Sequence, residues 1–145
     1  QLEGELEQDP SCLPALFDHW QDGVVKLAVT RQALKLRTEK PELFAHGSYE
    51  ALAAQGAKAD QVCAFARLHE GDTVIVAVPR LVARLEDDPD WGDTAVVLPT
   101  SVGAGRWRNL LTGAVIETQP REDGAAFPAG TLLGKFPFAL LVPEA

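Results

Sequence analysis

The sequence contains no methionine and only two cysteines, Cys12 and Cys63. Because translation begins with methionine, we expect this chain to be processed or to be cut from a longer protein. Each cysteine stands among apolar residues. This context favours two buried free thiols in a reducing cytoplasm over a disulfide pair.

Long hydrophobic runs and an excess of basic residues are also missing. No apolar run approaches the roughly 20 residues that a membrane helix needs. The acidic first residues, QLEGELEQDPS, contain no signal-peptide core. The 13 basic and 21 acidic residues give a net charge of −8, which argues against nucleic acid or a membrane surface as a partner. What remains is one ordinary globular domain of 145 residues.

The sequence motifs of common metal and catalytic sites are absent as well. CxxC, HxxxH and HExxH do not occur, nor do the GxSxG elbow and the GxxxxGK[ST] phosphate loop. Three histidines stand far apart in the sequence: His19, His46 and His69. We interpret them as partly exposed residues at helix and turn ends. We therefore predict no metal site and no cofactor.

A run of four carboxylates follows a predicted short helix: Glu86, Asp87, Asp88 and Asp90. Glycoside chemistry needs two carboxyl groups that face each other across a cleft, about 5 to 10 Å apart. Neighbouring carboxylates in one loop are more typical of a solvated, charged turn. We assign no catalytic residue in this sequence.

Two tryptophans are the candidates for substrate binding, Trp91 in DPDWGDT and Trp107 in GRWRN. Both stand beside turn residues, where an indole is often exposed. An exposed indole binds the apolar face of a pyranose ring, because that face desolvates easily. The alternative, which we favour, is that each tryptophan closes the end of the core under a loop.

Residues 23–38 carry a strong helical pattern. Apolar residues spaced by four, four and three form one stripe: Val25, Val29, Ala33 and Leu36. A second apolar group lies on a different face: Val24, Leu27, Ala28 and Leu34. A helix that covers one sheet needs one stripe. We therefore expect the second group to be exposed and residues 11–38 to be covered by another chain or mobile. Pro41 is expected to end the helix.

From about residue 48 the pattern changes to strands and turns. Strands are predicted at 48–54, 61–68, 73–78 and 93–100, with a further hairpin over 106–119. The other segments are expected to be a short helix, a loop and one broken or two short strands: 79–88, 119–130 and 131–142. This order predicts a mainly β fold with N-terminal helices, built as an antiparallel sandwich or an open barrel.

Four segments follow one another in the chain: WQDGVVKLAVTRQALKLRTEKPELFAHGSYEAL, VCAFARLHEGDTVIVAVPRLVARL, WGDTAVVLP and RWRNLLTG. In this order they resemble the C-terminal end of the maltooligosyl trehalose synthases, which are part of the α-amylase superfamily. The resemblance extends over about residues 20–113. The first two segments form a fairly specific combination, whereas LTG alone is common in amylase-like tails.

The resemblance implies an intracellular enzyme that converts the reducing-end α-1,4 link of a maltooligosaccharide to α-1,1, in trehalose biosynthesis. In that superfamily a (β/α)8 barrel carries three catalytic carboxylates, and a β-sandwich follows it. None of the family's catalytic motifs matches a position in this chain, so the barrel is absent from it. The resemblance implies closing barrel helices in residues 1–46 and an amylase-type C-terminal β-sandwich in residues 47–145, inactive alone and cytoplasmic.

The partners implied by the resemblance are the missing catalytic barrel of the same protein and the maltooligosaccharide substrate of the parent enzyme. Two alternatives stay open. One is a non-catalytic carbohydrate-binding sandwich that uses exposed Trp91 or Trp107. The other is an interaction domain whose acidic surface docks a basic partner in a salt-sensitive way.

Overall fold

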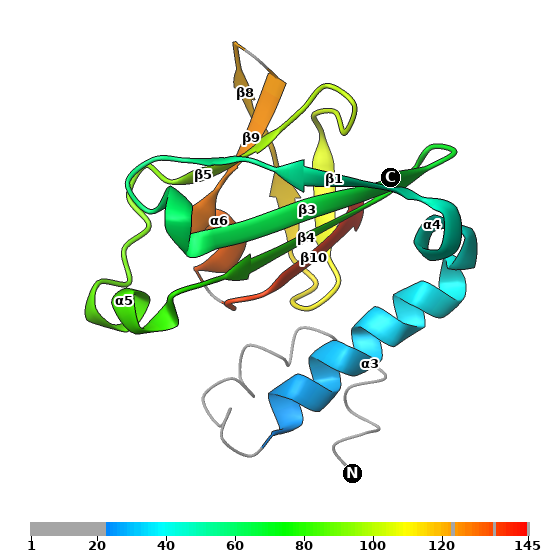
Figure 1. Cartoon of the computed structure of the whole chain (residues 1–145), viewed down its shortest axis with the longest axis horizontal. Helices are drawn as coiled ribbons and strands as arrows, with labels where there is room; N and C mark the ends of the chain where they lie inside the picture. Colours follow the sequence, from blue (N-terminus) through cyan, green and yellow to red (C-terminus); the bar gives the residue numbers. More distant parts are fainter. Residues whose placement is uncertain (1–22, 123, 135, 145) are drawn as a thin grey trace.

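The structure is a computed structural model that describes residues 23–122, 124–134 and 136–144 (Figure 1). At residues 82, 85 and 86 only the backbone is described. The predictions made for Cys12 and His19, and the part of the expectation for residues 11–38 that concerns residues 11–22, lie outside these ranges.

Short helices and strands follow the first long helix along the described ranges. The helices are α3 (Val24–Glu39), α4 (Pro41–His46), η3 (Ala59–Gln61, a 3-10 turn), α5 (Val82–Asp87) and α6 (Ala129–Leu133). The strands are β1 (Ser48–Leu52), β2 (Ala54–Gln55), β3 (Val62–His69), β4 (Asp72–Pro79), β5 (Ala95–Leu98), β6 (Arg106–Asn109), β7 (Val115–Glu117), β8 (Gln119–Arg121), β9 (Gly124–Pro128) and β10 (Ala139–Pro143).

The strands of the described chain form two sheets. The six-stranded sheet has the order β1-β3-β4-β10-β6-β7, and the four-stranded sheet has the order β2-β5-β9-β8. Neighbouring strands are antiparallel in both sheets. The chain passes from one sheet to the other at Ala53, between β1 and β2. The predicted antiparallel sandwich is therefore confirmed.

The main core lies between the two sheets. Its fully buried members come from central strands of both sheets and include Ala66, Ile75, Val96, Phe127 and Leu141. Ile75 faces this core, whereas its neighbour Val74 faces the opposite side of the sheet and is also buried. Because β4 is covered on both faces, its sequence is apolar at successive positions, as predicted for a central strand.

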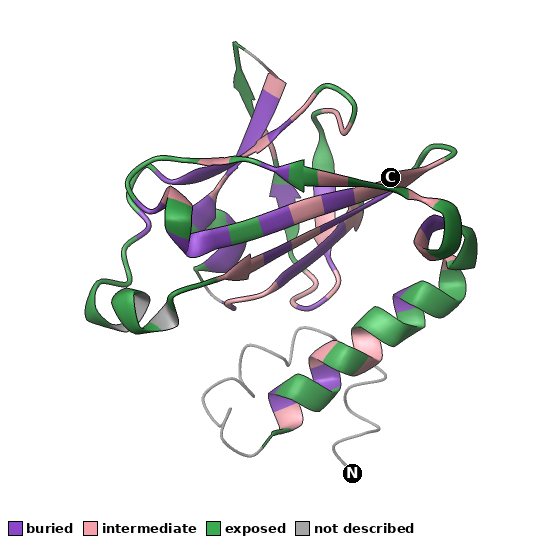
Figure 2. Ribbon diagram, viewed as in Figure 1, coloured by how far each residue is buried: buried purple, intermediate pink, exposed green. Residues whose placement is uncertain are grey.

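A second apolar cluster lies on the outer face of the six-stranded sheet, under α3 and α4. The helices contribute four buried side chains, Val25, Ala28, Leu36 and Leu43, and the sheet side contributes Val74 and Leu140. In Figure 2, α3 is buried along one side and exposed along the other. The helices therefore form a third layer, on the side of the sheet that faces away from the sandwich core.

The predicted stripes of the helix were partly wrong. Ala28 is buried against the sheet, whereas Ala33 is exposed. The residues of α3 that pack on the sheet are Val25, Ala28 and Leu36. They are three and eight positions apart, and these spacings place them on one face of the helix. On the other side, Leu27 and Leu34 are 59% and 54% exposed, as expected for the second group. Val24, which was predicted to accompany them, is half-buried.

Pro41 ends α3 as predicted, and it also begins α4, which the sequence did not predict. Proline suits the first position of a helix, because no hydrogen bond to its nitrogen is needed there. The Arg67 side chain donates to the backbone oxygens of Phe44 and Gly47, both at 3.1 Å. These bonds satisfy carbonyl groups at the end of α4 and attach the helix to β3.

The β3–β4 hairpin is confirmed, and its tight turn has a clear cause. Glu70 and Gly71 both have positive φ angles, 48° and 92°, the left-handed backbone that two-residue hairpin turns require. The predicted helix at 79–88 begins later, at Val82, because Pro79 still pairs with Val62 in the sheet. Leu81, directly before this helix, is exposed.

The end of the chain differs most from the sequence-based expectation. The predicted loop at 119–130 forms the β8–β9 hairpin, and the predicted strand at 131–142 begins as helix α6 and becomes a strand only at Ala139. Pro120 is tolerated because β8 is an edge strand, where a missing N–H faces no partner strand. Cys63, predicted to be buried, is exposed on β3, since the strand alternation turns Ala64 inward instead.

Candidate functional site

Both tryptophans proposed as sugar platforms are buried. Trp91 is 8% exposed and Trp107 is 3% exposed, and both belong to the core between the sheets. The Trp107 ring meets the Phe127 ring edge-on, with ring centroids 6.2 Å apart. The burial that we favoured from the sequence is therefore found at both positions, and the exposure that a sugar platform needs is not. Neither indole face is free to stack on a pyranose ring in this structure.

Two of the three histidines lie near each other. The rings of His46 and His69 are 6.4 Å apart, and His46 Nε2 lies 3.6 Å from Glu42 Oε2. The sequence did not predict this proximity, because the two histidines come from α4 and the end of β3. No group of three or more metal-binding side chains occurs among the residues that the structure describes. The described histidines thus lack the ligand set of a zinc site.

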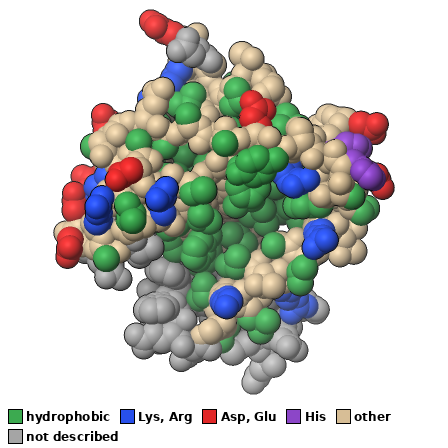
Figure 3. Space-filling model, in the orientation of Figure 1, with side chains coloured by type: hydrophobic (Ala, Val, Ile, Leu, Met, Phe, Trp, Pro, Cys, Tyr) green, Lys and Arg blue, Asp and Glu red, His purple; other side chains and the backbone are tan. Residues whose placement is uncertain are grey.

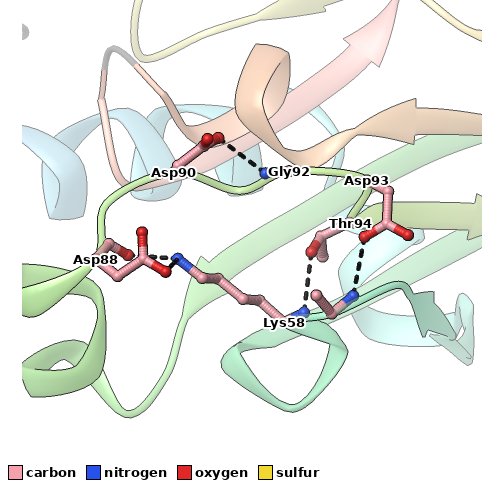
Figure 4. A network of polar contacts seen from close by, with 7 residues as sticks. Lys58, Asp88, Asp90, Gly92, Asp93 and Thr94 are labelled. Atoms are coloured by element: carbon pink, nitrogen blue, oxygen red, sulfur yellow. Dashed lines mark hydrogen bonds and ion pairs between the residues drawn. The ribbon is translucent and has the colours of Figure 1, made fainter.

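The predicted acidic turn is part of a polar network around Lys58 (Figure 4). Lys58 is 9% exposed, and its Nζ lies 3.1 Å from the Asp88 carboxylate and also donates to the Asp88 backbone oxygen. Asp90 accepts a bond from the backbone N–H of Gly92 at 2.9 Å. Asp87 is exposed, and the side chain of Glu86 lies outside the described part of the structure. Asp88 and Asp90 therefore bind groups of the protein itself.

The same network joins two segments that are far apart in the sequence. The Lys58 backbone N–H donates to Thr94 Oγ1, and the Ala57 N–H donates to an Asp93 carboxylate oxygen, both at 3.0 Å. A side chain at Gly56 would place its Cβ 2.7 Å from Thr94 Cα, so the close approach requires glycine. The acidic loop is therefore a structural clamp between two connecting segments, β2 to β3 and β4 to β5, each of which leads from one sheet to the other. No spacing in the sequence indicates that Lys58 pairs with it.

An arginine–glutamate pair connects the end of β10 to the β6–β7 hairpin. Arg108 donates from Nε and Nη2 to the two carboxylate oxygens of Glu144, at 2.7 and 2.6 Å. Its Nη1 also donates to the backbone oxygen of Gly113. The hydrogen bond to Arg108 lowers the pKa of Glu144, and the bond to Glu144 raises the pKa of Arg108. The pair therefore attaches the end of β10 to the β6–β7 hairpin.

The hollows lined by described residues include the following two. One, of about 370 Å³, is lined by Gln55, Val97, Arg121 and Glu122, and Arg121 donates to Gln55 across it at 2.6 Å. The other, of about 250 Å³, is lined by seven residues that include no titratable side chain: Asn109, Thr112, Ala114, Ile116, Thr131, Leu132 and Phe136. Neither hollow brings two carboxylates together, as glycoside chemistry requires.

No helix in the described ranges is long and apolar enough to cross a membrane. No protein-family model matches the chain. Sequence relatives were found in two strains of Mycobacterium tuberculosis, H37Rv and CDC 1551, each described as a putative maltooligosyl trehalose synthase. Each is 37% identical to this chain over 119 residues, which is 82% of the chain.

A solved structure is similar as well. It is a variant of maltooligosyltrehalose synthase from Arthrobacter ramosus, with 31% sequence identity and a TM-score of 0.61. The match covers 94% of this chain but 17% of that protein, and the chain spans 14% of the length of the Mycobacterium relatives. The resemblance predicted from the sequence is thereby confirmed: the chain is similar, in sequence and in fold, to part of maltooligosyl trehalose synthase.

Proposed function

We propose that this chain is the C-terminal structural portion of a maltooligosyl trehalose synthase. The observation that carries this proposal is the match over 82% of the chain to relatives of which it spans 14%. In this proposal residues 1–46 are the end of the barrel region and residues 47–145 are the C-terminal sandwich. The packing of α3 and α4 as a separate layer on the sheet supports that division.

The activity belongs, in this proposal, to the parent enzyme. That enzyme converts the reducing-end α-1,4 link of maltooligosaccharides to α-1,1, and its partners are the catalytic barrel and the maltooligosaccharide. The cytoplasmic location implied by the resemblance is part of the same proposal. This chain alone is inactive in this proposal, which is supported by the contacts of Asp88, Asp90 and Glu144: they bind Lys58, the Gly92 backbone and Arg108.

Incubation of the chain with maltopentaose tests the proposal. We expect no loss of reducing ends and no α-1,1-linked product over a time in which the intact Mycobacterium relative converts the substrate. Turnover by the isolated chain would disprove its inactivity. Restoration of turnover in a relative that carries this chain in place of its own matching segment would support the assignment to that enzyme.

The carbohydrate-binding alternative has lost its structural basis, because both candidate indoles are buried. A titration of the tryptophan fluorescence with maltooligosaccharides examines it directly. We expect no saturable quenching. Saturable quenching that disappears in Trp107→Ala, with the fold retained, would reinstate the binding function.

A further inference from the structure

The outer face of the six-stranded sheet is only partly covered by α3 and α4. Strand alternation and register place six side chains on this face beside and beyond the helices, since Phe65 pairs with both Ala51 and Val76, and Cys63 pairs with Val78. We call this set the open face; it consists of Tyr49, Ala51, Cys63, Phe65, Val76 and Val78.

The open face is apolar, and three of its six side chains are exposed while Phe65, Val76 and Val78 are half-buried. Tyr49 is 62% exposed and stacks on Phe65, with ring centroids 5.0 Å apart, and both Ala51 and Cys63 are exposed. Figure 3 shows hydrophobic side chains gathered over the middle of this side of the molecule. Arg67 pairs with Tyr49 in the register, but its guanidinium donates to carbonyl groups of α4. Its charge is therefore directed away from the rings.

The part of the outer face under the helices and the open face are continuous with each other. Val74 is buried under the helices, Val76 is half-buried beside them, and Val78, on the same side of the same strand, lies beyond the helix contacts. A contiguous apolar surface next to a packed layer is typical of an interface. An aromatic pair with one hydroxyl group at the rim also has the composition of an interface centre.

We propose that the open face packs against the rest of the parent polypeptide, completing the layer that α3 and α4 begin. This inference rests on the proposed function. The length of chain outside the structure favours that occupant, because the relatives contain this region within a chain about seven times longer, of which it spans 14%. A second copy fits less well, since two chains of net charge −8 repel each other.

The test uses the Mycobacterium relative with its matching segment replaced by this whole chain. Labelling of Cys63 with a maleimide, located by peptide mass mapping, reports directly on the open face. We expect labelling in this chimera to be slower than in the isolated chain by about tenfold or more, because a covered thiol is inaccessible. The isolated chain provides the reference rate under the same conditions.

A pair of variants complements the labelling. Tyr49→Glu places a charge on the open face, whereas Val115→Glu places one on β7, at the opposite edge of the same sheet. Val115 is a matched control, because it is apolar and 39% exposed. In the chimera, Tyr49→Glu is expected to lower the melting temperature and Val115→Glu to leave it nearly unchanged. In the isolated chain both are expected to be nearly neutral, which shows that the variants fold.

The outcomes separate the inference from the proposed function. An active chimera in which Cys63 labels at the isolated rate, or in which Tyr49→Glu is harmless, would overturn the inference and leave the proposed function intact. A folded chimera without turnover, beside an active parent relative, would overturn the proposed function. Sedimentation of the isolated chain as a dimer that Tyr49→Glu dissociates would assign the face to a second copy and overturn the inference.

Discussion

The two faces of the six-stranded sheet are covered in different ways. The inner face packs against the four-stranded sheet, and its central residues, such as Ile75 and Leu141, are fully buried. The outer face is buried at Val74, under the helices, and open at Tyr49. The sandwich core is therefore closed on both sides by strands of the described chain. Helices α3 and α4, in contrast, cover only part of the outer face of the six-stranded sheet.

The difference indicates where the stability of the chain resides. Burial of apolar surface contributes about 25 cal/mol per Å², so the larger core between the sheets stabilises the fold most. The helix layer contributes fewer buried side chains, with Leu36 and Leu43 as its largest ones. We expect it to open at a lower free energy than the sandwich, as a separate unit of local unfolding.

Of the variants considered, Phe127→Ala is expected to lower the free energy of unfolding most, because it acts on the core between the sheets. The Phe127 ring is fully buried between the sheets against Trp107, and its removal leaves a cavity. The free energy of unfolding should fall by about 3–5 kcal/mol. Urea denaturation followed by tryptophan fluorescence measures the loss. Val115→Ala, at an exposed edge position, is the control and should change stability by less than about 0.5 kcal/mol.

Leu36→Ala should have the next largest effect, about 2–3 kcal/mol, and it should act on the helix layer first. Amide hydrogen exchange is expected to speed up in α3 and α4 while the amides of β4 stay protected. Leu34→Ala is a matched control, because it is the same change on the exposed side of the same helix. Equal exchange in both variants would show that α3 is not held by the sheet.

Lys58→Met should have a smaller and local effect. It keeps most of the side-chain volume but removes the bonds from Nζ to Asp88, with an expected loss of about 1 kcal/mol. Hydrogen exchange should increase at residues 88–94 and not in α3. Lys26→Met, at an exposed position of α3, serves as the control. A loss no greater than in Lys26→Met would mean that Asp88 is held without Lys58.

Glu144→Gln should show the smallest effect, visible mainly as a pH dependence. Because Arg108 lowers the pKa of Glu144 in the folded chain, the pair stabilises the fold above the unfolded value of about 4.3. That stabilisation is lost as the pH falls through the lowered folded pKa. The melting-temperature difference between the wild type and Glu144→Gln should therefore shrink from neutral to acidic pH. Glu117→Gln is the exposed control, and a constant difference would contradict the pairing.

The sequence predicted those parts of the fold whose pattern is local. The helical period of residues 23–38 and the alternation on both sides of the Glu70-Gly71 turn are readable, because neighbouring residues determine them. The β8–β9 hairpin was missed because glycine, proline and charges suggest a loop, although Phe127 anchors it in the core. Helix α6 was missed because five residues are too few to show a helical period.

The burial of individual side chains and the contacts between segments far apart in the sequence were harder to predict. Turn residues beside Trp91 and Trp107 left exposure open, and burial, which we favoured, is what the structure has. The sequence alone could not decide between the two, because the depth of a side chain depends on how distant segments fold around it. The Lys58 clamp and the open face likewise depend on strands and loops that meet only in the folded chain. The resemblance to maltooligosyl trehalose synthase correctly predicted the similarity to part of that enzyme. It assigned no catalytic role to any residue of this chain.

The position of β10 has a consequence for the order of synthesis. β10 lies between β4 and β6, pairing with Ile75 on one side and Asn109 on the other through Leu141. As the chain leaves the ribosome, the β3–β4 and β6–β7 hairpins emerge first. Until residues 139–143 follow, β4 and β6 each have one edge without a partner strand. If the ribosome stalls before β10 is made, these two strand edges stay exposed and can pair with other chains. We therefore expect chaperones to bind the nascent chain in that interval.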